Sequence, residues 1–179
     1  TGSIQQIACA AGMFAPVGGL GTCELCTVGT YQNATGATHC IACPKGHLCP
    51  AAASAALKCD AGSYQDEQGR SGCKACAPGF ACASGAELPV ACVAGSKATA
   101  ASQAELCELC PAGEYQDLAQ QTSCQICPGG SSCAIGAVTH APCEPGTIAN
   151  GSGHSLCTPC AAGSFQSASG ATVCEECSP

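Results

Sequence analysis

Cysteine is the residue type that could do the most chemistry in this sequence, because a thiol can bind metal, exchange electrons or form a disulfide. The chain has 21 Cys in 179 residues, which is about 12% and above the roughly 8–10% that is typical of disulfide scaffolds. Cysteines at this density stay paired only in an oxidising compartment. We therefore expect an extracellular or cell-surface protein.

The other side chains could not build an ordinary apolar core. There is no Trp, one Met, and only six Tyr plus Phe, while much of the 46% apolar content is Ala and Cys. Covalent cross-links are the usual substitute in such chains. Five Lys plus Arg against twelve Asp plus Glu disfavour nucleic acid and anionic membranes as partners. No apolar run has the length of a membrane span, so we expect no membrane insertion. The opening TGSIQQIACAAG reads as a mature or excised segment.

A repeat of 16 to 18 residues organises the chain, and each unit starts at a cysteine that has glycine three places later. Seven units are long, with a second cysteine 14 or 15 residues on, and three are short, with a second cysteine six residues on. Each short unit ends in a nine-residue trailer of mostly small residues: PAAASAALK, ASGAELPVA and AIGAVTHAP. The predicted divisions are a lead-in at 1–8, units at 9–58, 59–91, 92–142 and 143–176, and the start of a truncated unit at 177–179.

The fold that this pattern predicts is a small disulfide-rich one, an elongated tandem array of short β-hairpins with little regular secondary structure. Glycine after the cysteine permits the positive φ of a sharp bend, and two short arms joined by a turn would form each hairpin. PAAASAALK could form one helical turn at most. An aromatic recurs at the fifth place of long units and would lie on a cystine of its own or the neighbouring unit. It occurs as Phe14, Tyr31, Tyr64, Tyr115 and Phe165, while Lys97 and Ile148 replace it elsewhere.

We favour a disulfide within each unit, from its first cysteine to its second. The expected pairs are Cys9–Cys23, Cys26–Cys40, Cys43–Cys49, Cys59–Cys73, Cys76–Cys82, Cys92–Cys107, Cys110–Cys124, Cys127–Cys133, Cys143–Cys157 and Cys160–Cys174. Cys177 is then unpaired within the segment, with a partner past Pro179 or on another chain. Interleaved pairing, such as Cys23 with Cys40 and Cys26 with Cys43, is the competing arrangement, and sequence alone does not decide connectivity.

Other readings of these residues are weaker. Cys23, Cys26, Cys40 and Cys43 have a spacing that suits zinc, but the run is simply two repeat boundaries. A redox-active C-x2-C would need a helix N-terminus or cationic neighbours, and the seven C-x2-C steps have little positive charge nearby. The carboxylate pairs Asp66-Glu67 and Glu175-Glu176 read as solvated turns rather than calcium ligands, and the four histidines, His39, His47, His140 and His154, read as surface residues. No nucleophile–base set appears, so we expect no enzyme and no cofactor.

Both asparagines of the chain lie in acceptor sequons. Asn33-Ala34-Thr35 and Asn150-Gly151-Ser152 each fall at the tip of a long unit. In a secreted protein this pattern predicts N-glycosylation, and the Ser and Thr of similar turns could carry O-glycans.

Three segments, CTVGTYQNATGATHCIACPKG, CDAGSYQDEQGRSGCKACAPG and CPAGEYQDLAQQTSCQICPGG, resemble the ephrin-receptor-like cysteine-rich repeat, which is similar in style to the TNF-receptor cysteine-rich module. The resemblance runs from Cys9 to Cys177. It implies an elongated, disulfide-laddered glycoprotein segment of the kind found in receptor ectodomains and in surface and matrix proteins. The short units with their trailers, Lys97 and Ile148 depart from the standard repeat.

Two functions remain open from the sequence. The first is a structural component of an extracellular filament, coat or matrix, since a one-dimensional repeat with low charge and many small residues favours packing against copies of itself or neighbouring repeats. Ten hairpins at about 10 Å each would give a rod on the order of 100 Å. The alternative is a ligand-binding or spacer module of a cell-surface receptor ectodomain. The shortage of exposed aromatic hot-spot residues disfavours this alternative.

Overall fold

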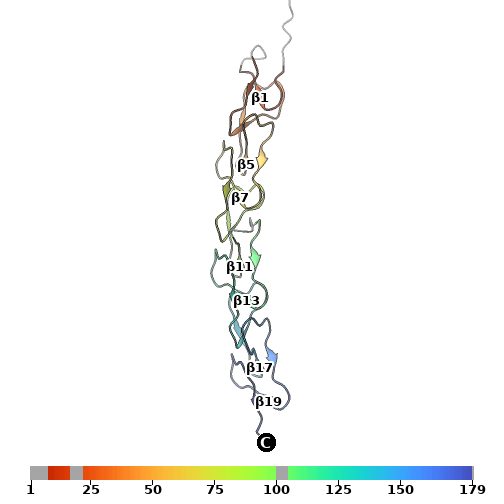
Figure 1. Ribbon diagram of the computed structural model, residues 1–179, viewed down its shortest axis with the longest axis vertical. Helices are drawn as coiled ribbons and strands as arrows, with labels where there is room; N and C mark the ends of the chain where they lie inside the picture. Colours follow the sequence, from red (N-terminus) through yellow and green to blue (C-terminus); the bar gives the residue numbers. More distant parts are fainter. Residues whose placement is uncertain (1–7, 17–21, 100–104, 179) are drawn as a thin grey trace, which may run out of the picture. The chain divides into compact units, whose positions relative to one another are not determined.

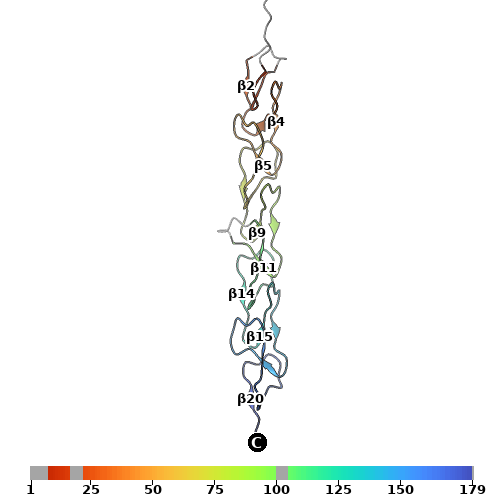
Figure 2. The same cartoon turned by 90° about the vertical axis from the view of Figure 1, so that its right-hand side faces the viewer.

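The computed structural model describes residues 8–16, 22–99 and 105–178. Within these ranges the chain forms ten two-stranded antiparallel sheets and no helix, which confirms the predicted array of disulfide-closed hairpins. No helix in those ranges is therefore long and apolar enough to cross a membrane. There are two compact units, one made of Thr1–Cys76 and Cys82–Pro89, the other of Ala77–Ala81 and Val90–Pro179. In each unit the hairpins follow one another in chain order, as Figures 1 and 2 show.

In every sheet the first strand follows a glycine turn. The second strand is either the two residues between the cysteines of a C-x2-C step or the last two residues of a trailer. The pairs are β1 (Met13–Phe14) with β2 (Glu24–Leu25), β3 (Thr30–Tyr31) with β4 (Ile41–Ala42), β5 (His47–Leu48) with β6 (Leu57–Lys58), β7 (Ser63–Tyr64) with β8 (Lys74–Ala75), β9 (Phe80–Ala81) with β10 (Val90–Ala91), β11 (Ser96–Lys97) with β12 (Glu108–Leu109), β13 (Glu114–Tyr115) with β14 (Gln125–Ile126), β15 (Ser131–Ser132) with β16 (Ala141–Pro142), β17 (Thr147–Ile148) with β18 (Thr158–Pro159), and β19 (Ser164–Phe165) with β20 (Glu175–Glu176). Isolated two-stranded hairpins are marginally stable in water, so other interactions must hold them.

Disulfides close the hairpins, and each one joins the two cysteines of a single unit. The bonds are Cys9–Cys23, Cys26–Cys40, Cys43–Cys49, Cys59–Cys73, Cys76–Cys82, Cys92–Cys107, Cys110–Cys124, Cys127–Cys133, Cys143–Cys157 and Cys160–Cys174. Interleaved bonds such as Cys23–Cys40 do not occur among them. In the loop-entropy account a 14-residue loop contributes about 3 kcal/mol and a six-residue loop roughly 2 kcal/mol, which is large beside the net stability of a small domain.

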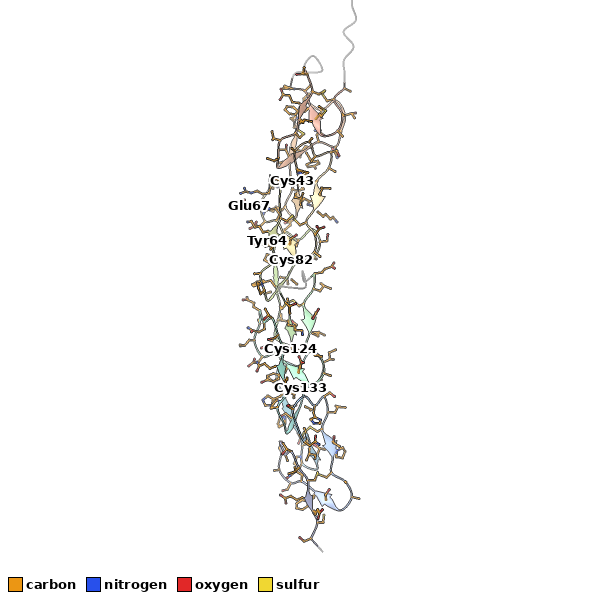
Figure 3. The ribbon with its side chains drawn as sticks, viewed as in Figure 1. Cys43, Tyr64, Glu67, Cys82, Cys124 and Cys133 are labelled. Atoms are coloured by element: carbon orange, nitrogen blue, oxygen red, sulfur yellow. A yellow bond between two sulfur atoms is a disulfide. The ribbon has the colours of Figure 1, made fainter. Side chains whose placement is uncertain are left out.

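The interior of the described chain consists of sulfur and small side chains. Its largest fully buried side chains are all cysteines. Around the Cys43–Cys49 disulfide (Cys43 is labelled in Figure 3) the buried Ala53 completes a small cluster, and Tyr31 of the preceding hairpin packs against it. The prediction that this aromatic lies on a neighbouring cystine is thus confirmed for Tyr31. The trailer PAAASAALK forms a turn and a parallel bridge from Ala53 to Tyr31, so the helical turn allowed for it does not form.

Turn glycines connect each hairpin to the next through the backbone. Gly29 has φ of 81°, a left-handed conformation that glycine adopts without steric cost. Its carbonyl accepts a hydrogen bond from Cys43 N (2.8 Å), and its own N–H donates to Cys49 O in the following unit (2.8 Å). The same two bonds recur along the chain, so the contacts between hairpins are made by main chain.

A second left-handed residue, which we call the tip residue, lies in each of the eight loops whose tips the structure describes. The tip residues are Gly36, Ala52, Gly69, Gly85, Gln120, Gly136, Gly153 and Gly170. Each donates its N–H to the carbonyl of the first cysteine in the preceding unit, at 2.7–2.8 Å. The carbonyl of the tip residue also covers the turn glycine two units earlier. A Cβ on Gly113, for example, would lie 2.3 Å from Gly153 O, so three successive units meet at one point.

A glutamine that follows the aromatic holds the loop in shape. The buried side chain of Gln65 donates from Nε2 to Gly72 O (2.6 Å) and accepts at Oε1 from Glu67 N (3.1 Å). Gln32 and Gln116 are buried and make the equivalent pair of bonds, and the more exposed Gln166 does so as well. An amide suits this position because it supplies one donor and one acceptor together.

We predict that Gly113→Ala destabilises the protein far more than Gly146→Ala. Both glycines have positive φ (90° and 84°), and a left-handed alanine costs about 1 kcal/mol at either site. Only Gly113 lies beneath a carbonyl, whereas a Cβ on Gly146 meets nothing within 4 Å. Gly113→Ala should therefore lose a further ~2 kcal/mol as its hydrogen bonds to neighbouring units break. Denaturant unfolding with the disulfides intact measures this difference. Equal losses in the two variants would refute the three-unit contact.

Gln65→Glu should lower the unfolding free energy at pH 7 by about 1–3 kcal/mol, because a carboxylate oxygen replaces the buried N–H donor that faces Gly72 O. The loss should shrink in acid, where the protonated carboxyl can donate again. Gln166→Glu is the matched control, since water can replace the bonds of that partly exposed side chain. Unfolding midpoints at pH 7 and pH 3 test both variants. A pH-independent loss at Gln65 would contradict the role given to its amide.

Candidate functional site

The most strongly charged site in the described chain is the loop around Gly69. Lys74 Nζ lies 2.6 Å from Asp66 Oδ1 and 3.4 Å from Glu67 Oε1, and Arg70 also pairs with Glu67 (labelled in Figure 3). The hydrogen bond from Lys74 lowers the pKa of Asp66, and the one from Arg70 lowers the pKa of Glu67. The bond to Asp66 raises the pKa of Lys74. All four groups are solvent-exposed, so the pairing contributes little stability.

These pKa shifts determine how the stability contributed by the ion pairs changes with pH. Lowered carboxyl pKa values mean that the contribution of Asp66 and Glu67 is present above their ordinary pKa values and is lost as pH falls through the folded ones. The raised pKa of Lys74 means that its contribution is present below its ordinary pKa and is lost only as strongly alkaline pH passes the folded value. In this arrangement both carboxylates face cations, Asp66 toward Lys74 and Glu67 toward Arg70 and Lys74.

A counterpart of this loop without an ion pair occurs at the next long unit that precedes a short one. Gln125 Nε2 donates to Asp117 Oδ1 (3.0 Å), and Tyr115 donates from its hydroxyl to Gln125 Oε1 (3.1 Å). The Tyr115 ring meets His140 edge-on at 5.5 Å, and His140 Nδ1 lies 3.2 Å from Ser131 Oγ. Gln125 takes the place that Lys74 has in its own unit, so the arrangement is a loop brace and not a charged cluster.

The cysteines that have zinc spacing hold no free thiolates. Cys23, Cys26, Cys40 and Cys43 are each in a disulfide with another residue of their own unit. Cys177 is the exposed free cysteine, and its backbone N–H closes the last hairpin by donating to Gly163 O (2.9 Å). Among the residues that the structure describes, no three His, Cys, Asp or Glu side chains converge as metal ligands would.

The remaining predicted site residues lie apart from one another. Glu175 and Glu176 are both exposed in β20 and pair with Phe165 and Ser164. Consecutive strand residues point to opposite faces, so the two carboxylates do not form one site.

The histidines make contacts within their own unit or with the preceding one. His47 Nδ1 lies 2.8 Å from Lys45 O, and His39 Nδ1 lies 3.4 Å from Thr38 Oγ1. His154 accepts a backbone bond from Cys133 N (3.0 Å). His140 braces Tyr115 as described above.

Both sequons are open to solvent in the described chain. Asn33 and Thr35 are exposed beside the buried Gln32, and Asn150 and Ser152 are exposed beside the buried Ala149. Asn33 directly follows Gln32, whose side-chain amide makes two hydrogen bonds within the same loop.

One coupling between neighbouring units was not predicted from the sequence. Tyr31, Tyr64 and Tyr115 lie in the long units that precede short ones, and each forms a parallel bridge to a trailer alanine. Long units that precede long ones lack both the tyrosine and the glutamine, and carry a buried alanine in the glutamine position: Ala15, Ala98 and Ala149. The pair Tyr-Gln therefore matches a short neighbour and Ala a long one. The sequence does contain this signal, because the residue types at these two positions change with the length of the unit that follows.

Comparison with known protein families matches three segments of the chain, residues 12–58, 98–144 and 146–179, to the family described as tyrosine-protein kinase ephrin type A/B receptor-like. These segments comprise 128 of the 179 residues. A search of curated proteins finds no match. The family is a receptor-like cysteine-rich repeat and not a class of enzymes, and together with ten disulfides it indicates an extracellular or cell-surface location. The chain belongs to the ephrin-receptor-like cysteine-rich repeat family.

Proposed function

We propose that this chain is a structural building block of an extracellular filament, coat or matrix. The observation that carries the proposal is that disulfides close each unit and main-chain hydrogen bonds connect one hairpin to the next. Loop side chains are then free to meet neighbouring molecules. Many large apolar side chains are exposed in the described chain, among them Leu106, Leu156 and Val173. Exposed apolar surface on a scaffold that lacks a large core favours association.

The partners in this proposal are copies of the same chain or neighbouring repeats of an assembly. The trailers 50–58, 83–91 and 134–142 supply lateral contacts, because they are rich in small residues that let backbones approach closely. Nucleic acid is disfavoured as a partner by the net charge of −7. Catalysis has no place in the proposal, since every cysteine but Cys177 is in a disulfide and Asp66 and Glu67 are paired with Lys74 and Arg70.

A receptor module that binds ligand through its loops is the alternative. Such modules rely on exposed aromatic and arginine anchors. In this chain Tyr31, Tyr64 and Tyr115 bridge to the neighbouring unit, and Arg70 is paired with Glu67. Phe165 is the aromatic that stands out to solvent in the described residues. This use of the aromatics inside the repeat favours the structural role.

Electron microscopy of the secreted, disulfide-intact protein at rising concentration tests the proposal. The expected result is ordered filaments, sheets or bundles that reducing agent disperses together with the hairpins. Alanine substitution at single loop tips should leave assembly nearly unchanged, since broad contact faces carry it. Dispersed monomers at all concentrations, with a ligand whose binding is lost on substitution of one or two tips, would instead establish the receptor role.

N-glycosylation at Asn33 and Asn150 is the second part of the proposal. We expect glycopeptide mass spectrometry of protein secreted from a eukaryotic host to find sugar at both positions, because both sequons are exposed in loops. Asn33→Gln and Asn150→Gln should each remove one glycan and leave the disulfide pattern unchanged. Bare asparagine at both sites in otherwise glycosylated secreted material would overturn this part alone.

A further inference from the structure

The loop tip at Gly136 differs from every other tip that the structure describes. The residue before the tip residue is small or polar elsewhere: Thr35, Ala51, Gln68, Ser84, Ala119, Ser152 and Ser169. The residue two places after it is polar elsewhere: Thr38, Ser54, Ser71, Glu87, Thr122, Ser155 and Thr172. At Gly136 the same two positions hold Ile135 and Val138. The other tips fold with the same backbone bonds, so the hairpin does not need these aliphatic side chains.

Three aliphatic residues near Gly136 form what we call the aliphatic tip. Ile135 and Val138 flank the glycine in the chain, and Leu109 lies beside it. Leu109 Cδ2 lies 3.4 Å from the position that a Cβ on Gly136 would occupy, and Gly136 N donates to Cys110 O next to Leu109. Val138 Cγ1 lies 3.2 Å from the corresponding position on Gly95. The three side chains are nevertheless 69%, 49% and 59% exposed. Leu109 and Val138 thus each lie beside a glycine, while much of all three side chains remains in water, and such exposed aliphatic surface favours a partner that covers it.

The contrast with the tip at Gly85 shows that this position also accepts charge. There the place of Leu109 is taken by Lys58, whose Cδ lies 3.4 Å from the equivalent point on Gly85. Ser84 takes the place of Ile135, and its Oγ donates to Cys59 O (3.2 Å). Glu87 takes the place of Val138. One hairpin geometry thus carries a polar tip in one compact unit and an aliphatic tip in the other.

The part of the chain that carries the aliphatic tip is acidic. Glu105 is exposed just before Leu109 in the chain, while Glu108 points to the other face of β12 and lies opposite Lys97. From residue 98 to residue 179 the sequence has no Lys or Arg and seven acidic residues, whereas residues 1–97 have five of each sign. The whole net charge of −7 therefore belongs to the part of the chain that carries this tip.

We infer that the aliphatic tip is a docking site for a protein segment that offers aliphatic side chains flanked by lysine or arginine. The aliphatic side chains supply the area to be buried, and the net negative charge of residues 98–179 steers a basic partner toward them. A second copy bound through the same tip would bring two acidic segments together, which like charges disfavour. An anionic membrane surface is repelled for the same reason. The proposed assembly into filaments does not depend on this tip, since the trailers 50–58 and 83–91 remain for contacts between copies.

The test uses the whole disulfide-intact chain and a fluorescent probe peptide of sequence Lys-Leu-Lys-Leu-Lys-Leu-Lys, with binding measured by fluorescence anisotropy. The variant Ile135→Ala/Val138→Ser takes its residues from the equivalent tip at Ala52, so its hairpin is expected to form, and a thiol count that matches the parent chain checks this. The variant should bind about tenfold more weakly, because two aliphatic side chains no longer become buried. Glu105→Gln/Glu108→Gln should also weaken binding and reduce its dependence on salt.

The matched control is Leu156→Ala/Val173→Ser, which removes two exposed aliphatic side chains from the same compact unit and should leave affinity within about twofold. A peptide with serine in place of leucine should bind all variants weakly and alike. Equal losses in the tip variant and the control would overturn the inference, since binding would then be general to the acidic surface. Sedimentation that shows parent dimers abolished by Ile135→Ala/Val138→Ser would also overturn it, in favour of a second copy. Filament formation by that variant bears only on the proposed function.

Discussion

Closure of each hairpin by its own disulfide is the constraint on which the rest of the structure depends. Two-residue strands cannot hold a hairpin in water, and the buried side chains are cysteine, alanine, serine and glutamine. The cystine both limits the conformations of the unfolded chain and supplies an apolar contact for the preceding unit, since Tyr31 packs on Cys43–Cys49. Hydrophobic burial, which stabilises most domains of this length, is divided here among many small clusters.

Given closed hairpins, the backbone decides how they stack. Turn glycines such as Gly29 and Gly113 must be left-handed and must lack a side chain, because a carbonyl from two units further on occupies the space of a Cβ. The tip N–H then bonds to a cysteine carbonyl of the preceding unit. These interactions use no variable side chain. The loops can therefore differ widely, from the ion pairs around Gly69 to the aliphatic tip at Gly136, without a change of scaffold.

Much of this fold could be predicted from cysteine and glycine spacing alone. The step from Cys26 to Gly29 indicates a left-handed turn, and the second cysteine shows where the loop returns, so hairpins followed directly. The contact from Gly113 to Gly153 could not be predicted, since it joins units about 40 residues apart and no local pattern encodes it. The one helical turn that PAAASAALK could have formed is absent because Ala52 donates its N–H to Cys26 O and Ala53 O accepts from Gln32 N. Gln65 stood in the motif, but its role required the position of Gly72 O.

The positions of the disulfides also determine how the covalent chain would respond to a pulling force. Tension entering at Cys26 crosses to Cys40 through sulfur and bypasses the loop between them, so only the two residues before Cys43 can lengthen. After a short unit the path is different, because nine residues separate Cys49 from Cys59, Cys82 from Cys92 and Cys133 from Cys143. The trailers are therefore the longest segments that can extend under tension. Their number and spacing determine how far the disulfide-bonded chain can lengthen before its backbone is fully extended.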